Sequence, residues 1–150
     1  VEGPPDMFSP DEISSFTART NGAMVFEDSL GVCRFNTRTD LPLLAQAVNA
    51  VTGWDMDAEE AMCVGQRAIN LLRAFNIRHG IDPELDVPSR RYGSTPLDGP
   101  AAGVSIRSAW DGMLATYYGL LGWDEMGVPT RETLEKLGIE YVADELGISA

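Results

Sequence analysis

The chain has 150 residues, the length of one domain, and its mix of apolar and charged residues is typical of a globular protein. Its net charge of −12 argues against nucleic acid and anionic membrane surfaces as partners, since both are negatively charged. No run approaches the roughly 18 apolar residues of a membrane-spanning helix. No basic, apolar leader opens the sequence, so no secretory signal is visible. With only two cysteines, the expected compartment is the reducing cytoplasm, and neither nucleic acid nor membrane is expected as a partner.

The first helical pattern begins after Ser9. This serine is placed to act as N-cap, with Pro10 at the first helical position and Glu12 at the position that completes a capping box. We expect the helix to run to about Phe26. Its C-terminal end then delivers a segment that contains Asp28.

A second, short apolar helix is predicted over residues 41–51. Asp40 is its cap, Pro42 is tolerated in the first turn, and Gly53 ends it.

A third and longer helix is predicted to begin after Asp57, with Glu60 in the box position. It is expected to stop at Gly80, after two cationic residues that suit a helix C-terminus. One apolar stripe along it is predicted to face the core: Ala61, Val64, Ala68, Leu72 and Phe75.

Residues 81–103 interrupt the helical pattern with four prolines and several glycines. Such a long irregular connection is usually functional or unstructured. Arg90 and Arg91 favour a connection that is anchored to the domain.

Helical periodicity returns near Ser105 and ends at Gly122, with one predicted inward face: Ile106, Trp110, Met113, Leu114, Tyr117 and Leu121. Thr130 is predicted to cap a short helix that turns Leu134 and Leu137 inward, and residues 139–146 hold one or two further turns. No strand alternation is visible, so the predicted fold class is all-α.

The segment from Asp28 to Cys33 combines an acid, a glycine and a thiol between two apolar helical patterns. A carboxylate accepts hydrogen bonds from a paired N–H edge, and Gly31 lets backbone approach a ligand closely. A thiolate binds soft metals or the iron of an iron–sulfur cluster. Two cysteines in a chain of this length are no disulfide framework, so we expect both thiols to be free.

Further landmarks follow in order: Arg67, Arg73-Ala-Phe75-Asn76, Val87-Pro88-x-Arg90, Pro96-x-Asp98-Gly99-Pro100, Tyr117-Tyr118-x-x-x-Gly122-Trp123-Asp124, Gly127-x-Pro129-Thr130 and Leu137-Gly138. Together with Asp28-x-x-Gly31-Val32-Cys33, this succession resembles the C-terminal region of the tungsten-containing aldehyde:ferredoxin oxidoreductases. The resemblance covers residues 28–138. Val32 stands where the family usually has leucine.

The resemblance implies a multihelical C-terminal domain of an oxidoreductase. The whole enzyme would carry tungsten (or molybdenum) on two pterins beside a [4Fe–4S] cluster, and would oxidise aldehydes to carboxylic acids with electron transfer to ferredoxin. Asp28 would bind the amino-pyrimidine edge of one pterin. Cys33 would be the fourth cluster ligand and the metal-binding residue of this chain, and Gly31 and Val32 would complete the cofactor-binding loop.

The other cluster cysteines, the second pterin loop and the acid and histidine beside the tungsten lie elsewhere in the family. We therefore expect residues 1–150 to be one C-terminal domain of a larger polypeptide, inactive alone, with a cofactor loop at about 27–36. Its N-terminal domains would be its partners, and no catalytic residue is assigned here. The isolated segment is expected to form a homo-oligomer or to have a mobile 27–36 loop.

Two alternatives stay open. One is the tungsten subunit of a benzoyl-CoA reductase-like enzyme, and the other is a cofactor-free helical interaction module. For the remaining polar and aromatic residues we favour structural roles. Cys63 would pack against another domain, His79 would be a surface cation, and a solvated or salt-bridged face would hold Arg67, Arg73 and Asn76. Core packing with polar contacts is expected for Trp110, Tyr117, Tyr118 and Trp123.

Overall fold

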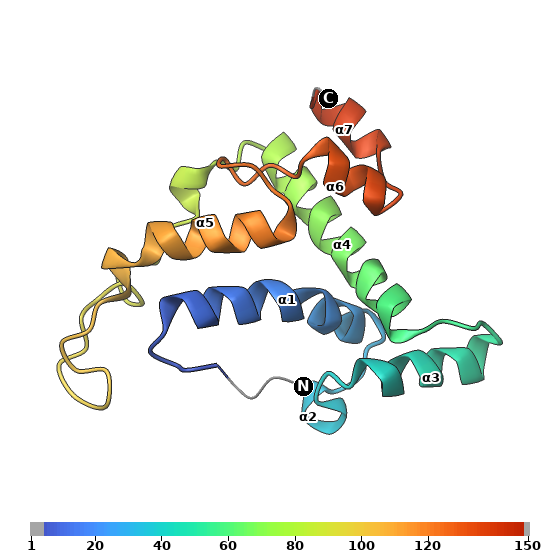
Figure 1. Ribbon diagram of the computed structural model, residues 1–150, viewed down its shortest axis with the longest axis horizontal. Coiled ribbons are helices and arrows are strands. Elements are labelled where there is room, and N and C mark those ends of the chain that lie inside the picture. The colour runs from blue at the N-terminus through green and yellow to red at the C-terminus, as the bar shows by residue number, and fades with distance from the viewer. Residues whose placement is uncertain (1–4, 149–150) are drawn as a thin grey trace.

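Helices make up all the regular structure in residues 5–148, the part of the chain that the computed structural model describes (Figure 1). The α-helices are α1 (Pro10–Ser29), α2 (Arg34–Thr37), α3 (Leu41–Thr52), α4 (Ala58–Arg78), α5 (Trp110–Leu121), α6 (Arg131–Lys136) and α7 (Tyr141–Leu146). Two 3-10 turns, η1 (Pro83–Leu85) and η2 (Ile106–Ser108), lie between α4 and α5. The predicted all-α class is confirmed. None of the described helices is long and apolar enough to cross a membrane.

The helix starts agree with the predicted caps. The side chains of Ser9, Asp40 and Thr130 each accept a hydrogen bond from a backbone N–H of the first turn that follows. At the start of α4, Asp57 and Glu60 form a complete capping box, with bonds of 2.8 and 3.1 Å. These local signals fix where the helices begin.

Two details of α1 differ from the prediction. Glu12 does not close a box onto Ser9, because its carboxylate accepts from the backbone N–H of Asp6 at 2.9 Å. The helix also continues past Phe26 to Ser29, so that Asp28 lies in its last turn. The carboxylate of Asp28 is therefore carried by a helix and not by a free loop.

Helices α1, α4 and α5 form the centre of the fold: α1 lies alongside α5 and packs against α4 (Figure 1). At the α1–α4 crossing, Gly22 and Gly65 face each other so closely that a Cβ on Gly65 would overlap the carbonyl of Gly22. Glycine at both positions lets the two backbones approach without a side chain between them.

Two apolar clusters flank this centre. The first joins α1, α3 and α4: Ala23, Phe26, Leu41, Leu44, Ala45 and Ala61. The second joins α4 to the C-terminal helices: Ala74, Leu134, Leu137, Ile139, Val142 and Ala143. The predicted inward residues of α6 are confirmed, with Leu134 completely buried.

The predicted buried stripe of α4 is partly wrong. Ala61 is buried, but Leu72 and Phe75 are 61 and 60 % exposed. The buried face is rotated from the predicted one and consists of Ala61, Gly65, Ile69, Asn70, Arg73 and Ala74. Because α4 packs against α1 on one side and the C-terminal helices on another, its partners set which face is buried.

Between α4 and α5 the described chain has the two 3-10 turns η1 and η2 and otherwise irregular backbone. It is anchored to the domain, but not through Arg90 and Arg91, which are exposed. Two of its anchors are side chains that follow residues 81–103 in the sequence. Arg107 Nε donates to the carbonyl of Gly93 at 2.9 Å, and Trp110 Nε1 donates to that of Asp86 at 2.8 Å.

Candidate functional site

The segment singled out by its chemistry forms a tight corner between α1 and α2. The N–H of Gly31 donates to the carbonyl of Asp28 at 3.1 Å, and Gly31 adopts a φ of +67°, which favours glycine. Cys33 then has extended backbone and is the N-cap residue of α2, where its carbonyl accepts from the N–H of Asn36 at 2.9 Å. The corner thus places one acid before the turn and one thiol after it.

The functional groups of the corner face solvent. The side chain of Asp28 is 64 % exposed, and Cys33 is exposed with a free thiol. Val32 is 41 % exposed. A Cβ added at Gly31 would meet nothing within 4 Å, so the backbone there is open to an approaching ligand. Both cysteines are free, as predicted.

Behind this corner lies Glu27, a carboxylate with a completely buried side chain. Thr37 Oγ1 and the Thr39 N–H (3.0 Å) donate to its Oε1, and Thr39 Oγ1 (2.8 Å) and Arg34 Nε (3.3 Å) donate to its Oε2. The hydrogen bond from Thr37, opposed by burial and helped by Thr39 and Arg34, holds the pKa of Glu27 below its usual value.

Sequence reasoning missed Glu27, although a signal for its burial was present. It follows Ala23 by four residues and Phe26 by one, and so continues the buried face of α1. Nothing local identified the threonines that satisfy it.

Arg34 connects the buried acid to the exposed one. Its Nη2 lies 2.7 Å from Asp28 Oδ1, and its Nε donates to Glu27. The same Nη2 also donates to the carbonyl of Met24 at 3.4 Å. Arg34 directly follows Cys33 in the sequence. Its guanidinium therefore connects the segment after the turn to the two acids at the end of α1.

The donor set tests which cofactor the corner fits. A cubane cluster takes four thiolates, and this corner offers one. Across residues 5–148 no group of three or more histidines, cysteines and acids is placed to hold a metal ion. The exposed Cys33 fits the role of a single ligand to a cluster whose other ligands lie elsewhere, and the exposed Asp28 fits an edge with paired N–H donors.

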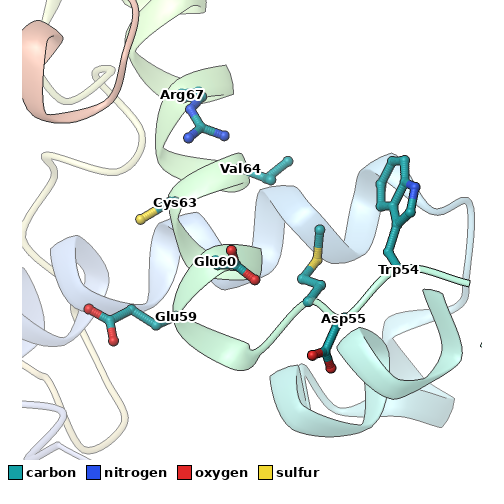
Figure 2. A pocket seen from close by; sticks show the side chains of 8 residues that line it. Trp54, Asp55, Glu59, Glu60, Cys63, Val64 and Arg67 are labelled. Atoms are coloured by element: carbon teal, nitrogen blue, oxygen red, sulfur yellow. The ribbon is translucent and has the colours of Figure 1, made fainter. Parts of the chain in front are cut away.

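A separate hollow of about 490 Å³ lies where the α3–α4 connection meets the first turns of α4 (Figure 2). Figure 2 shows Glu59 and Cys63 on one side of α4 and Trp54 on the other. Two of the polar groups that line the hollow have structural roles: Glu60 belongs to the capping box, and Arg67 Nε donates to the carbonyl of Leu137 at 2.6 Å. This hollow shares no residue with the Asp28–Cys33 corner.

A second hollow, of about 480 Å³, opens between α1, α4 and α5 over a buried polar network. Arg73, only 8 % exposed, places Nη2 2.7 Å from Asp86 Oδ2 and donates from Nε to the carbonyl of Gly127 at 2.7 Å. The hydroxyl of Tyr118 donates to the same carboxylate oxygen of Asp86 at 2.6 Å. Of the expected solvated or salt-bridged face, Arg73 confirms the salt bridge, but it is buried and not solvated.

The network lowers the pKa of Asp86 and raises that of Tyr118. Burial alone would raise the pKa of Asp86, but hydrogen bonds from Arg73 and Tyr118 and the positive charge of Arg73 outweigh it and lower that pKa. Burial and the neighbouring Asp86 raise the pKa of Tyr118 to about 12.

The aromatic residues pack with polar contacts, as predicted. Trp123 Nε1 donates to Asn70 Oδ1 at 2.9 Å, and the hydroxyl of Tyr117 accepts from Asn21 Nδ2 at 2.8 Å. The rings of Tyr117 and Trp123 meet edge to face, with centroids 6.0 Å apart. His79 is exposed at the end of α4, as expected for a surface residue, with its ring 4.1 Å from that of Phe75.

Comparison with known proteins gives consistent matches. A family model described as aldehyde ferredoxin oxidoreductase, domains 2 and 3, matches residues 2–139. Over 75 % of its length the chain is 37 % identical to a tungsten-containing aldehyde ferredoxin oxidoreductase of Pyrococcus furiosus and 36 % identical to that of Thermococcus kodakarensis. It is also 32 % identical to a Pyrococcus furiosus protein named aliphatic sulfonate oxidoreductase, WOR-like subunit.

A solved structure extends the likeness to the fold. The active-site complex BamBC of benzoyl-coenzyme A reductase, in complex with 1,5-dienoyl-CoA, superposes on 97 % of the chain with a TM-score of 0.73 and 25 % identity. The chain spans 19 % of the length of the curated oxidoreductases and 22 % of that structure's chain. Each match is therefore to a part of a much longer protein.

Proposed function

Because the chain belongs to the aldehyde ferredoxin oxidoreductase family, in its domains 2 and 3, we propose that it supplies one pterin-binding carboxylate and one cluster-binding thiolate to a tungsten enzyme. The observation that carries this proposal is the exposed corner with Asp28 before Gly31 and Cys33 after it. The remaining cluster ligands would come from N-terminal domains of the same, longer polypeptide.

In this proposal each residue of the corner has a separate task. The carboxylate of Asp28 accepts hydrogen bonds from the amino and ring N–H groups of a pterin. Gly31 leaves room for the ligand against the backbone. Cys33, as thiolate, ligates one iron, and Val32 joins the two without a charged group of its own.

When bound, the tungsten (or molybdenum) bis-pterin and the [4Fe–4S] cluster supply the redox chemistry by which an aldehyde and water give a carboxylic acid, two protons and two electrons. The electrons pass to ferredoxin, as the name of the family indicates. No residue of this chain is assigned as catalytic acid or base. We propose a cytoplasmic enzyme, since ferredoxin and reduced thiols belong to that compartment.

The likeness to BamBC favours a second candidate function. It extends over 97 % of the chain, so a reductive enzyme acting on an aromatic coenzyme A thioester would use the same fold. The Asp28–Cys33 corner serves both candidates equally. Assays of the full-length enzyme with aldehydes plus oxidised ferredoxin, and with a dienoyl-CoA plus an electron acceptor, separate them.

The decisive experiment concerns the thiol. Full-length protein is purified without oxygen as wild type, Cys33→Ser and the matched control Cys63→Ser. Iron, tungsten and molybdenum are then measured, and the reduced cluster is recorded by electron paramagnetic resonance. We expect wild type and Cys63→Ser to contain a [4Fe–4S] cluster and Cys33→Ser to lack an intact one. A complete cubane in Cys33→Ser overturns the proposal. If wild type contains neither iron nor tungsten nor molybdenum, the cofactor-free interaction module is favoured instead.

A further inference from the structure

We infer that Glu27 is a positioning residue, which fixes the carboxylate of Asp28 and the backbone of Cys33 relative to each other through Arg34, Thr37 and Thr39. The inference rests on the proposed function and extends it from the groups that touch cofactors to the group that holds them in place. Glu27 itself is completely buried and touches no cofactor in this account.

The first observation is the way in which Glu27 is satisfied. It is a fully buried carboxylate, and each of its two oxygens accepts two hydrogen bonds. All four donors belong to residues 34–39, on the far side of the corner from α1. The last turn of α1 is thereby tied to the segment after the turn, and both ends of the 28–33 corner are held together.

The second observation is how these donors reach the two candidate cofactor ligands. Arg34 donates to Glu27 from Nε while its Nη2 lies 2.7 Å from Asp28 Oδ1. Thr37 donates its hydroxyl proton to Glu27, and its backbone N–H donates to the carbonyl of Cys33 at 3.3 Å. A single intervening residue therefore connects Glu27 to each candidate ligand: Arg34 connects it to the carboxylate of Asp28, and Thr37 connects it to the backbone of Cys33.

The third observation is backbone strain at the point of attachment. Arg38 and Thr39 adopt φ values of +51° and +56°, which are unfavourable for side chains with a Cβ and most of all for a β-branched residue. Such strain persists only where the surroundings determine the conformation. Here the strained turn directs both the N–H and the hydroxyl of Thr39 onto Glu27.

The arrangement requires a carboxylate in particular. Four donors converge on Glu27, and an ionised acid presents acceptors only. Glutamine has nearly the same shape, but its NH₂ group would face either the N–H of Thr39 or Nε of Arg34, and neither of these can accept a hydrogen bond. Glu27→Gln therefore sets two donors against each other and removes the negative charge, with little change in volume.

The experiment compares wild type, Glu27→Gln and the control Glu132→Gln in full-length, anaerobically purified protein. Glu132 is an exposed carboxylate paired with Lys136, so its replacement removes the same charge without touching the corner. We measure iron per protein, the electron paramagnetic resonance spectrum and the reduction potential of the cluster, and hydrogen exchange of residues 28–39. Glu27→Gln is expected to lose at least half of the cluster or to shift its spectrum and potential, with faster exchange in 28–39, while Glu132→Gln matches wild type.

The inference is overturned if Glu27→Gln is folded by circular dichroism and has the iron content, spectrum and potential of wild type. If Glu27→Gln does not fold, Thr37→Val takes its place, since it removes one donor to Glu27 and leaves the carboxylate otherwise paired. The same outcomes then apply. Cys33→Ser separates the two claims. If Cys33→Ser keeps its cubane, the proposed function is wrong. If Cys33→Ser loses its cubane but Glu27→Gln behaves like wild type, only the positioning role is wrong.

Discussion

Arg73, in the C-terminal half of α4, and Asp86, in the irregular connection before α5, form an ion pair with 2.7 Å between Nη2 and Oδ2. The pair is more than a contact between two residues. Tyr118 of α5 donates to the same carboxylate, and Arg73 reaches the carbonyl of Gly127 beyond α5. The ion pair and its partners therefore join α4, the irregular connection, α5 and the segment after α5. This network supports our first three predictions.

We predict that Asp86→Asn destabilises the chain by about 1–3 kcal/mol near pH 7, because it leaves the buried guanidinium of Arg73 without its partner charge. The pKa of Asp86 is lowered in the fold, so its contribution is present above its unfolded pKa of 3.8 and is lost as the pH falls through the lower, folded pKa. Urea unfolding of wild type and variant between pH 2 and 7 measures this. A stability difference that does not shrink toward the acid end contradicts the prediction.

Tyr118 provides the opposite test at alkaline pH. Its pKa rises from 10.0 to about 12 in the fold, so the folded chain keeps a proton that the unfolded chain has released between these values. Stability from this group is complete below pH 10 and is lost as the pH rises toward 12. Tyr118→Phe should lack this loss, which parallel unfolding curves from pH 8 to 12 would show; equal slopes in both proteins would argue against it.

Gly127 adopts a φ of +68°, and a Cβ there would overlap Arg73 Nη2 and come within 2.8 Å of Tyr118 Cζ. We expect Gly127→Ala to cost about 2–5 kcal/mol, the sum of an unfavourable φ and an overpacked core. Gly138→Ala is the matched control: its φ is +67° but a Cβ would meet nothing within 4 Å, so only about 1–2 kcal/mol is expected. Equal losses in chemical unfolding would show that the contact with the network is unimportant.

The crossing of α1 and α4 gives the next prediction. Gly65→Ala should destabilise the chain by about 1–3 kcal/mol, because the added methyl group has to displace the backbone of Gly22. Gly119→Ala, in the last turn of α5 with open space around it, should instead stabilise by roughly 0.5–1 kcal/mol. Thermal unfolding of the two variants and wild type measures both effects. If helix propensity alone mattered, both substitutions would stabilise the chain, and that outcome would contradict the prediction for Gly65.

The two thiols should differ in reactivity. Cys33 is exposed and Cys63 is half-buried, so a thiol reagent such as iodoacetamide should label Cys33 first in this chain without cofactors. Mass spectrometry of partly labelled protein locates the modified residue. In full-length protein that contains its cluster, Cys33 should be protected while Cys63 is not; labelling of Cys33 at an undiminished rate would contradict its role as ligand.

The sequence identified what depends on neighbours along the chain. Caps at Ser9, Asp40, Asp57 and Thr130 placed the helix starts correctly, because a cap bonds to backbone two or three residues away. The order of motifs also identified the family, which the match over residues 2–139 confirms. The acid, glycine and thiol of the corner were found in the same way, since they lie within six residues of sequence; their binding roles stay predictions.

The tertiary structure decided what depends on residues distant in sequence. Periodicity alone gave the wrong face of α4, because the contacts with α1 and the C-terminal helices determine which side is covered. Arg73 and Glu27 carry charges that composition assigns to the surface, yet both are buried where partners from other segments satisfy them. A buried charge is stable only when its partners are placed in space, and that placement exists only once the chain has folded.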